Sequence, residues 1–195
     1  MAGSTVTRRL FFALWPERAL QIALAEATRD VVLASGGRPI PSDNFHVTLA
    51  FLGSVPEARL TDVVAVGAAV ATEVGSLPLQ VGLETLEYWQ QPQVLCATGP
   101  TRSAAHSSGG AMLAGRLKAN LSALGLAPDL NGSRSVVDST TTGFRPHVTL
   151  VRKVVHPIAT LPIEPAHWSF EDFALVESRR GPAGSTYNIL ATFRA

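Results

Sequence analysis

The spacing of apolar residues divides the first half of the chain into strands and helices. Short β-prone runs at 8–14, 45–52, 77–88 and 93–98 predict strands, because their apolar residues are contiguous or alternate with polar ones. Between the first two runs, apolar residues recur every three or four positions over 19–33. That periodicity predicts a helix packed against a sheet.

Two further segments are expected to be helical, and two are expected to be loops. Residues 57–74 are rich in Ala and Val and carry few charges, which predicts a largely buried helix. Residues 111–124 place their apolar side chains on one face, which also predicts a helix. Small and turn-forming residues dominate 101–110 and 128–143, so we expect flexible loops there.

The C-terminal part is predicted to be mainly extended. A strand over 147–151 is followed by a proline-rich connection, a strand near 170–178 and a final strand over 187–193. Turn residues between the last two strands predict an antiparallel hairpin. Strand and helix therefore alternate twice, which predicts a pseudo-symmetric α+β fold in a single domain, 1–195, with a central cleft.

Composition restricts the classes of protein to which the chain can belong. Hydrophobic residues make up 46% of the sequence and charged ones 16%, which favours an ordered globular protein over a disordered one. The single cysteine, Cys96, excludes an intramolecular disulfide and a Cys-based zinc site, and it fits a reducing cytoplasm. Pro16 ends the apolar run at 10–15, and no run approaches the roughly 20 residues of a membrane span. We expect a soluble, cytoplasmic protein.

Charge is distributed unevenly between the two halves, although the net charge is only +1. Residues 1–100 contain more acidic than basic side chains, and residues 101–195 contain more basic than acidic ones. The excess of basic side chains in the C-terminal half is compatible with an anionic ligand held mainly by that half. It is equally compatible with a random scatter of arginines. It falls short of the broad basic patch of a duplex nucleic-acid binder.

The sequence His-Val-Thr-Leu occurs twice, beginning at His46 and again at His147. In a strand, successive side chains point to opposite faces, so each histidine shares a face with the threonine two positions later, Thr48 or Thr149. The valine and leucine of each copy share the other face. The pattern predicts two strands that bury their backs and present imidazole and hydroxyl groups to a common cleft.

Two facing histidines can act as a general acid and a general base. Histidine exchanges protons near neutral pH, so a neutral imidazole can take a proton from water while an imidazolium protonates a leaving alkoxide. The threonine hydroxyls can donate hydrogen bonds to phosphate oxygens. A single His-x-Thr in a strand is more often structural than catalytic, but a second identical copy among only five histidines favours the catalytic interpretation.

Residues 9–14, 44–53, 144–152 and 187–193 together resemble the two-histidine phosphoesterase superfamily. Within it, the resemblance is to LigT-like RNA 2′,3′-cyclic phosphodiesterases, once described as 2′-5′ RNA ligases. It implies two lobes, each an antiparallel sheet with helices packed outside, on either side of a water-filled cleft. It also implies hydrolysis of a ribose 2′,3′-cyclic phosphate to a 2′-phosphate, without a metal or another cofactor.

The same resemblance assigns roles within the repeated sequence. It makes His46 the proton donor to the leaving 3′-oxygen and His147 the proton acceptor that activates water, with Thr48 and Thr149 holding the phosphate. Coupled histidines can exchange protons, so the pair is better determined than the division of roles. The implied partners are RNA 3′ ends or small cyclic nucleotides, and we expect a monomer.

Three other residues are candidates for the same cleft. Arg152 is predicted to clamp the phosphate, with a surface ion pair as the alternative. Tyr187 and Phe45 are candidates for stacking on a base, although aromatic residues in strands more often belong to the core. Two other functions stay open, a non-catalytic module that binds nucleotides or RNA ends and a reversible 2′-5′ RNA ligase.

Overall fold

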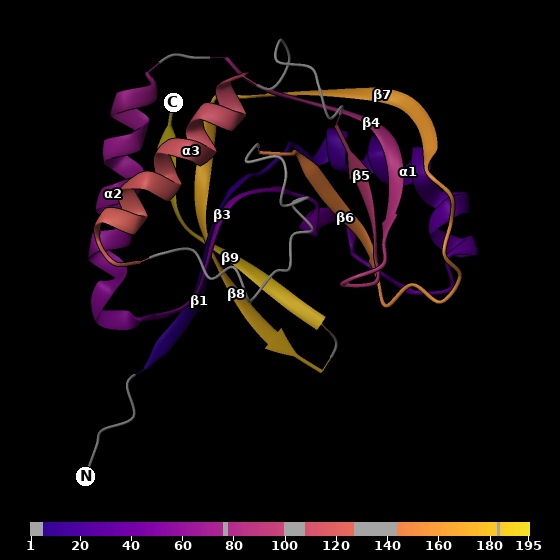
Figure 1. The fold of residues 1–195 in the computed structure, drawn as a ribbon, viewed down its shortest axis with the longest axis horizontal. Helices are drawn as coiled ribbons and strands as arrows, with labels where there is room; N and C mark the ends of the chain where they lie inside the picture. Colours follow the sequence, from indigo (N-terminus) through magenta and orange to yellow (C-terminus); the bar gives the residue numbers. More distant parts are fainter. Residues whose placement is uncertain (1–5, 76–77, 100–107, 127–143, 183) are drawn as a thin grey trace.

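The computed structural model describes residues 6–75, 78–99, 108–126, 144–182 and 184–195. Two antiparallel sheets with helices packed outside them make up the fold, as predicted (Figure 1). The helices and strands follow one another in this order: β1 (Thr7–Leu14), α1 (Arg18–Ala34), β2 (Arg38–Pro39), β3 (Val47–Pro56), α2 (Leu60–Val74), β4 (Leu79–Trp89), β5 (Val94–Thr98), α3 (Ser108–Ala123), β6 (His147–Arg152), β7 (Leu161–Phe170), β8 (Asp172–Gly181) and β9 (Gly184–Arg194). Two short 3-10 helices, Ser42–Asn44 and Glu57–Arg59, precede β3 and α2.

The first sheet, called sheet A here, has four strands in the order β3-β1-β8-β9. Helices α2 and α3 lie together on one side of it (Figure 1). The predicted C-terminal hairpin is confirmed, because β8 pairs with β9 along its whole length. The end of this hairpin projects beyond the body of sheet A, where β1 no longer pairs with β8.

The second sheet, called sheet B here, has five strands in the order β2-β6-β5-β4-β7, with α1 lying behind it (Figure 1). The two lobes are interleaved in the sequence. The chain enters sheet A with β1, crosses to sheet B for β2, returns for β3, crosses again for β4 to β7, and ends in sheet A. Strands remote in sequence therefore become neighbours in each sheet.

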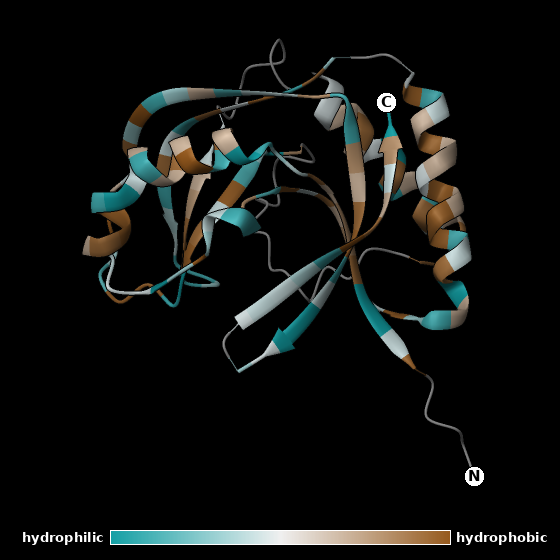
Figure 2. Ribbon diagram, turned by 180° about the vertical axis from the view of Figure 1, so that it is seen from behind, coloured by the Kyte–Doolittle hydropathy of each residue, from teal (hydrophilic) through white to brown (hydrophobic). Residues whose placement is uncertain are grey.

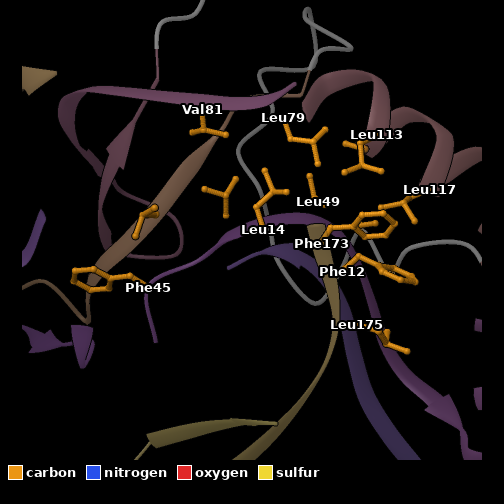
Figure 3. Close-up of a cluster of buried hydrophobic side chains, with 14 of the residues drawn as sticks. Phe12, Leu14, Phe45, Leu49, Leu79, Val81, Leu113, Leu117, Phe173 and Leu175 are labelled. Carbon is orange, nitrogen blue, oxygen red and sulfur yellow. The ribbon is translucent and has the colours of Figure 1, made fainter. Parts of the chain in front are cut away.

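One large core joins the backs of both sheets to the helices. Figure 3 shows how its side chains from β1, β3, β4, α3 and β8 meet in this core. Strand β1 illustrates how alternation builds it: Leu10, Phe12 and Leu14 point into the core, and Phe11 and Ala13 point to the opposite face. In Figure 2 the free end of β8 is hydrophilic, and the start of β9 beside it has intermediate hydropathy.

The predicted proline-rich connection is wrong, because its residues 161–169 belong to strand β7. Most of its side chains are exposed, and Trp168 is the fully buried exception. Prolines 162 and 165 are tolerated because β7 is the edge strand of sheet B, where one side of the backbone has no partner strand. An edge strand with one buried residue shows no apolar alternation, so its sequence looked irregular.

The two predicted loops fall mainly outside the described residues. The described part of 101–110, residues 108–110, is helical and begins α3 three residues earlier than predicted. Residues 100–107 and 127–143 are not described, so the prediction for 128–143 is untested. No helix within the described ranges is both long and apolar enough to cross a membrane.

Candidate active site

The two copies of the repeated sequence lie in different sheets. Thr48 belongs to β3 of sheet A, with His46 directly before that strand, and His147 and Thr149 belong to β6 of sheet B. In both copies the valine and leucine are buried in the core, and the histidine and threonine are partly exposed on the other face. The alternation predicted from the sequence therefore holds at both positions.

Both histidines make the same backbone hydrogen bond. His46 Nδ1 lies 2.7 Å from the carbonyl oxygen of Asn44, and His147 Nδ1 lies 3.1 Å from that of Arg145. Because a carbonyl oxygen only accepts hydrogen bonds, Nδ1 carries the proton and donates it in both cases. The Nε2 atom of each ring is then left to exchange a proton with a bound molecule.

His46 is surrounded by aromatic rings from sheet A. Trp15 stacks nearly parallel to the imidazole, with ring centroids 5.1 Å apart and planes 6° apart. Tyr187 approaches it edge-on at 5.1 Å, and Phe11 lies at 5.0 Å. These rings belong to a small apolar cluster on the cleft side of sheet A, separate from the main core. The cluster covers part of this imidazole with apolar surface.

This environment shifts the proton affinity of His46 strongly. Burial lowers its pKa from about 6.5 to about 4, and the bond to the Asn44 carbonyl opposes the change only partly. The positive charges of His147 and Arg152 lower the pKa further. Groups from sheet B thus act electrostatically on a histidine from sheet A, so the two copies lie within electrostatic reach of each other.

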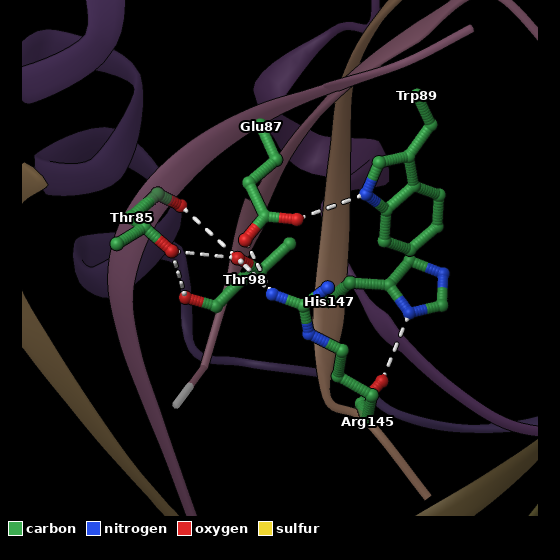
Figure 4. Close-up of polar contacts among 6 residues, drawn as sticks. All are labelled: Thr85, Glu87, Trp89, Thr98, Arg145 and His147. Carbon is green, nitrogen blue, oxygen red and sulfur yellow. Dashed lines mark hydrogen bonds and ion pairs between the residues drawn. The ribbon is translucent and has the colours of Figure 1, made fainter. Parts of the chain in front are cut away.

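His147 has polar rather than aromatic surroundings. Among the described residues, Trp89 is the ring that lies against it, with centroids 4.8 Å apart. Behind that ring, the Trp89 indole N–H donates to Glu87, and the Arg145 guanidinium pairs with the other oxygen of the same carboxylate (Figure 4). Arg145 also donates to the Thr98 hydroxyl at 3.3 Å. The residue whose carbonyl orients His147 is therefore itself fixed by a hydrogen-bonded network.

The network changes two ionisation equilibria. Burial lowers the pKa of His147, the Arg145 carbonyl raises it, and the Arg145 charge lowers it, so it ends below its ordinary value. Burial would raise the pKa of Glu87, but hydrogen bonds from Arg145 and Trp89 outweigh burial and lower it. Glu87 therefore stays ionised and holds Arg145 in place.

Cys96 lies opposite Thr149 in the pairing of β5 with β6, and its Sγ is 3.9 Å from the threonine hydroxyl. Its side chain is fully buried. Burial raises the pKa of this thiol to about 12, so it remains protonated at neutral pH. Cys96 contributes packing below the cleft and is unsuited to act as a nucleophile.

The other predicted residues meet different outcomes. Arg152 is exposed at the end of β6, within electrostatic reach of His46. Tyr187 is partly exposed and contacts His46, where a base could also reach it. The prediction for Phe45 is wrong, because only 4% of this residue is exposed and its ring lies in the main core (Figure 3). A base cannot stack on a ring enclosed in this way.

Four residues of the site were missed by sequence reasoning: Phe11, Trp15, Glu87 and Trp89. Alternation along β1 places the first two on the face away from the core, which was the available signal. Glu87 is an acidic residue in a mostly apolar run, which is a weaker signal. Within the described ranges, no group of three or more His, Cys, Asp or Glu side chains is arranged to hold a metal ion.

The sequence of this chain matches a known protein family. A model of the family described as LigT like Phosphoesterase matches residues 14–93. The chain is 31% identical over 191 residues to a Thermus thermophilus protein named RNA 2′,3′-cyclic phosphodiesterase. That match covers 95% of this chain and 89% of the relative.

Solved structures agree in fold. The crystal structure of TT0787 of Thermus thermophilus matches with a TM-score of 0.74 and 30% identity, covering 95% of this chain and 97% of that one. Escherichia coli LigT in its apo form matches with a TM-score of 0.74 and 21% identity, covering 96% and 97%. The likeness to both proteins extends over nearly the whole chain. The chain belongs to the LigT-like phosphoesterase family.

Proposed function

We propose that this protein hydrolyses the 2′,3′-cyclic phosphate of RNA 3′ ends or small nucleotides to a 2′-phosphate. The observation that carries the proposal is the pair of histidines, one beside each sheet, whose Nδ1 atoms both donate to the carbonyl two residues earlier. The Thermus thermophilus relative, named RNA 2′,3′-cyclic phosphodiesterase, supports the substrate class. Escherichia coli LigT, which shares the fold, was crystallised with 3′-AMP.

In the proposed reaction, His147 Nε2 takes a proton from water as the water oxygen attacks phosphorus. The bond from phosphorus to the 3′-oxygen breaks, and His46 Nε2–H donates a proton to that oxygen. The products are a 2′-phosphate and a 3′-hydroxyl, and solvent exchange resets both rings. Thr48, Thr149 and Arg152 hold the non-bridging oxygens, and each proton transfer contributes about 10²- to 10⁴-fold in rate.

The pKa values fit these roles once a substrate is present. A lowered pKa keeps His147 neutral at pH 7, as a base must be. His46, with a pKa of about 4, is neutral at pH 7 too. An anionic phosphate beside it favours the imidazolium, so the substrate itself raises the pKa of the acid that will protonate it. Proton uptake should therefore accompany binding of the anion.

A direct assay tests the proposal. An oligonucleotide with a 2′,3′-cyclic phosphate end, incubated with the protein in excess EDTA, should yield a 2′-phosphate. His46→Ala and His147→Ala should each lose at least about 100-fold in kcat. His156→Ala is the matched control, because this histidine is exposed and lies outside the cleft. Tight binding of the oligonucleotide without turnover would instead favour a non-catalytic binding module.

A further inference from the structure

A row of arginines extends from the proposed phosphate position along the edge of sheet B. Arg152 on β6 stands directly opposite Arg38 on β2 in the antiparallel pairing of these strands. Both side chains are exposed. Directly opposed like charges destabilise a strand pair, and an anion bound between them relieves that repulsion. The position of Arg38 therefore points to a negatively charged ligand that extends beyond Arg152.

Arg38 also reaches the projecting end of the β8–β9 hairpin. A Cβ atom built on Gly184, at the hairpin turn, would lie 3.1 Å from Arg38 Nη2. Gly184 has a φ of +129°, in the region that favours glycine, so this turn suits both its backbone and the close guanidinium. An arginine from sheet B thus contacts the part of sheet A that projects beyond the lobes.

Arg180 adds a second cation at this end of the hairpin. It pairs with Ser185, one residue from the Gly181–Gly184 turn. Tyr187 pairs with Ser178, two positions before Arg180, so the tyrosine and Arg180 lie on the same face of the hairpin. That face contacts His46 through Tyr187. A strand repeat of about 3.3 Å per residue puts Arg180 roughly 7 Å along the hairpin from that contact.

The neighbouring arginines on the other face are neutralised. Arg179 pairs with Glu177 at 2.9 Å, and Arg8 pairs with Glu57 and also with Glu177 at 3.5 Å. In the part of the chain that the structure describes, no ion pair involves Arg38, Arg152 or Arg180. The charge that can attract an anion is therefore concentrated on the face that leads into the cleft.

We propose that Arg38 and Arg180 bind phosphodiester groups on the 5′ side of the reacting cyclic phosphate, so that the protein prefers an RNA strand to a cyclic mononucleotide. This inference rests on the proposed function, because it extends the same substrate. The reacting group is the 3′ end of the RNA, so the strand can continue only in the 5′ direction. The hydrophilic end of β8, seen in Figure 2, and the edge of sheet B then hold it from two sides.

Kinetics on two substrate lengths test the proposal. Wild-type protein should show a higher kcat/KM for a trinucleotide ending in a cyclic phosphate than for 2′,3′-cyclic AMP. The double variant Arg38→Ala/Arg180→Ala should lose about tenfold or more on the trinucleotide, since charge-assisted hydrogen bonds to phosphate are removed. On the mononucleotide it should stay within about twofold. Arg179→Ala, the adjacent arginine on the opposite face, should match wild type on both substrates.

Binding gives a readout that does not depend on turnover. The affinity for a labelled trinucleotide ending in the 2′-phosphate product should fall with salt, and the double variant should reduce the slope of log K against log[salt] by about 1.4, or about 0.7 per phosphate. Equal losses on both substrate lengths, or an unchanged salt slope, would overturn the proposal. A wild-type protein that binds the trinucleotide in this way but turns over neither substrate would overturn the proposed function alone.

Discussion

The two histidines occupy identical sequence contexts and very different surroundings. Each is held by a hydrogen bond from Nδ1 to the carbonyl two residues earlier. His46 is enclosed by three aromatic rings from sheet A, and His147 is flanked by one ring and a charged network from sheet B. The backbone geometry is thus repeated, and the neighbouring strands make the two rings chemically unequal.

This difference teaches how one short sequence can serve two roles. A general acid and a general base need different proton affinities, and an identical repeat cannot supply that difference by itself. Burial among aromatic rings lowers the pKa of His46 to about 4, so this ring is protonated at neutral pH only when a bound anion raises that pKa. Burial also lowers the pKa of His147, and the nearby Arg145 charge lowers it further, so this ring stays neutral and ready to accept a proton.

The strongest test is a double-mutant cycle on the two histidines. His46→Ala and His147→Ala should each lower kcat by about 10²- to 10⁴-fold. If the two act in one concerted step, the double variant should lose far less than the product of the single losses, since either deletion already disables that step. Rates under single-turnover conditions measure this. Fully multiplicative losses would show that the histidines act independently.

The network behind His147 should contribute both stability and rate. Glu87→Leu leaves the half-buried Arg145 guanidinium without its carboxylate, which should cost about 1–2 kcal/mol of unfolding free energy after allowance for its partial exposure. We expect kcat to fall about tenfold as the Arg145 backbone, and His147 with it, shifts. Urea denaturation and steady-state kinetics measure the two effects.

The matched control for that network is the exposed ion pair between Arg59 and Asp62. Asp62→Ala should change stability by less than about 0.5 kcal/mol and leave the rate unchanged. The double variant Glu87→Leu/Arg145→Met should recover part of the stability lost in Glu87→Leu, because no unpaired charge remains. A double variant less stable than the single one would contradict the assigned pairing.

The aromatic surroundings of His46 can be opened by one substitution. Trp15→Ala removes the parallel ring and admits water, so the pKa of His46 should rise from about 4 toward 6.5. Trp89→Ala should raise the pKa of His147 by less, because a single ring is removed from surroundings that keep the Arg145 charge. NMR titration of the imidazole protons distinguishes the two. If the pKa of His46 does not change after Trp15→Ala, desolvation is not the cause of its low value.

The pKa of His46 also makes stability depend on pH. Because the pKa of His46 is about 4 when folded and about 6.5 when unfolded, the unfolded chain binds more protons between these values. The contribution of His46 to stability is therefore present above pH 6.5 and is lost as the pH falls toward 4. His46→Gln should flatten the stability curve in that interval relative to the exposed-site control His156→Gln. If the unfolding free energy of His46→Gln changes with pH as steeply as that of the wild type, the pKa of His46 is not lowered in the folded protein.

The local patterns explain which parts of the fold were predictable. Strands β3 and β6 bury one face around the repeated sequence, so period-two alternation revealed their position and the face that carries His46 or His147. Strand β1 is buried on both faces, so a contiguous apolar run revealed it instead. Helix α2 was recognisable from a long apolar segment. Strand β7 was not, because an exposed edge strand buries almost nothing and leaves no periodic signal.

By itself, the sequence determined that two His-Val-Thr-Leu strands exist and that histidine and threonine share a face in each, because side-chain direction in a strand is a local property. Only the tertiary structure decided what stands beside them. Trp15, directly after β1, and Tyr187 on β9 reach His46 across long stretches of chain, and Glu87 and Arg145 meet 58 positions apart. The order of the strands and the packing of side chains between them determine how deeply each histidine is buried and which charges lie near it. These surroundings give the two histidines of an identical four-residue sequence different chemical properties.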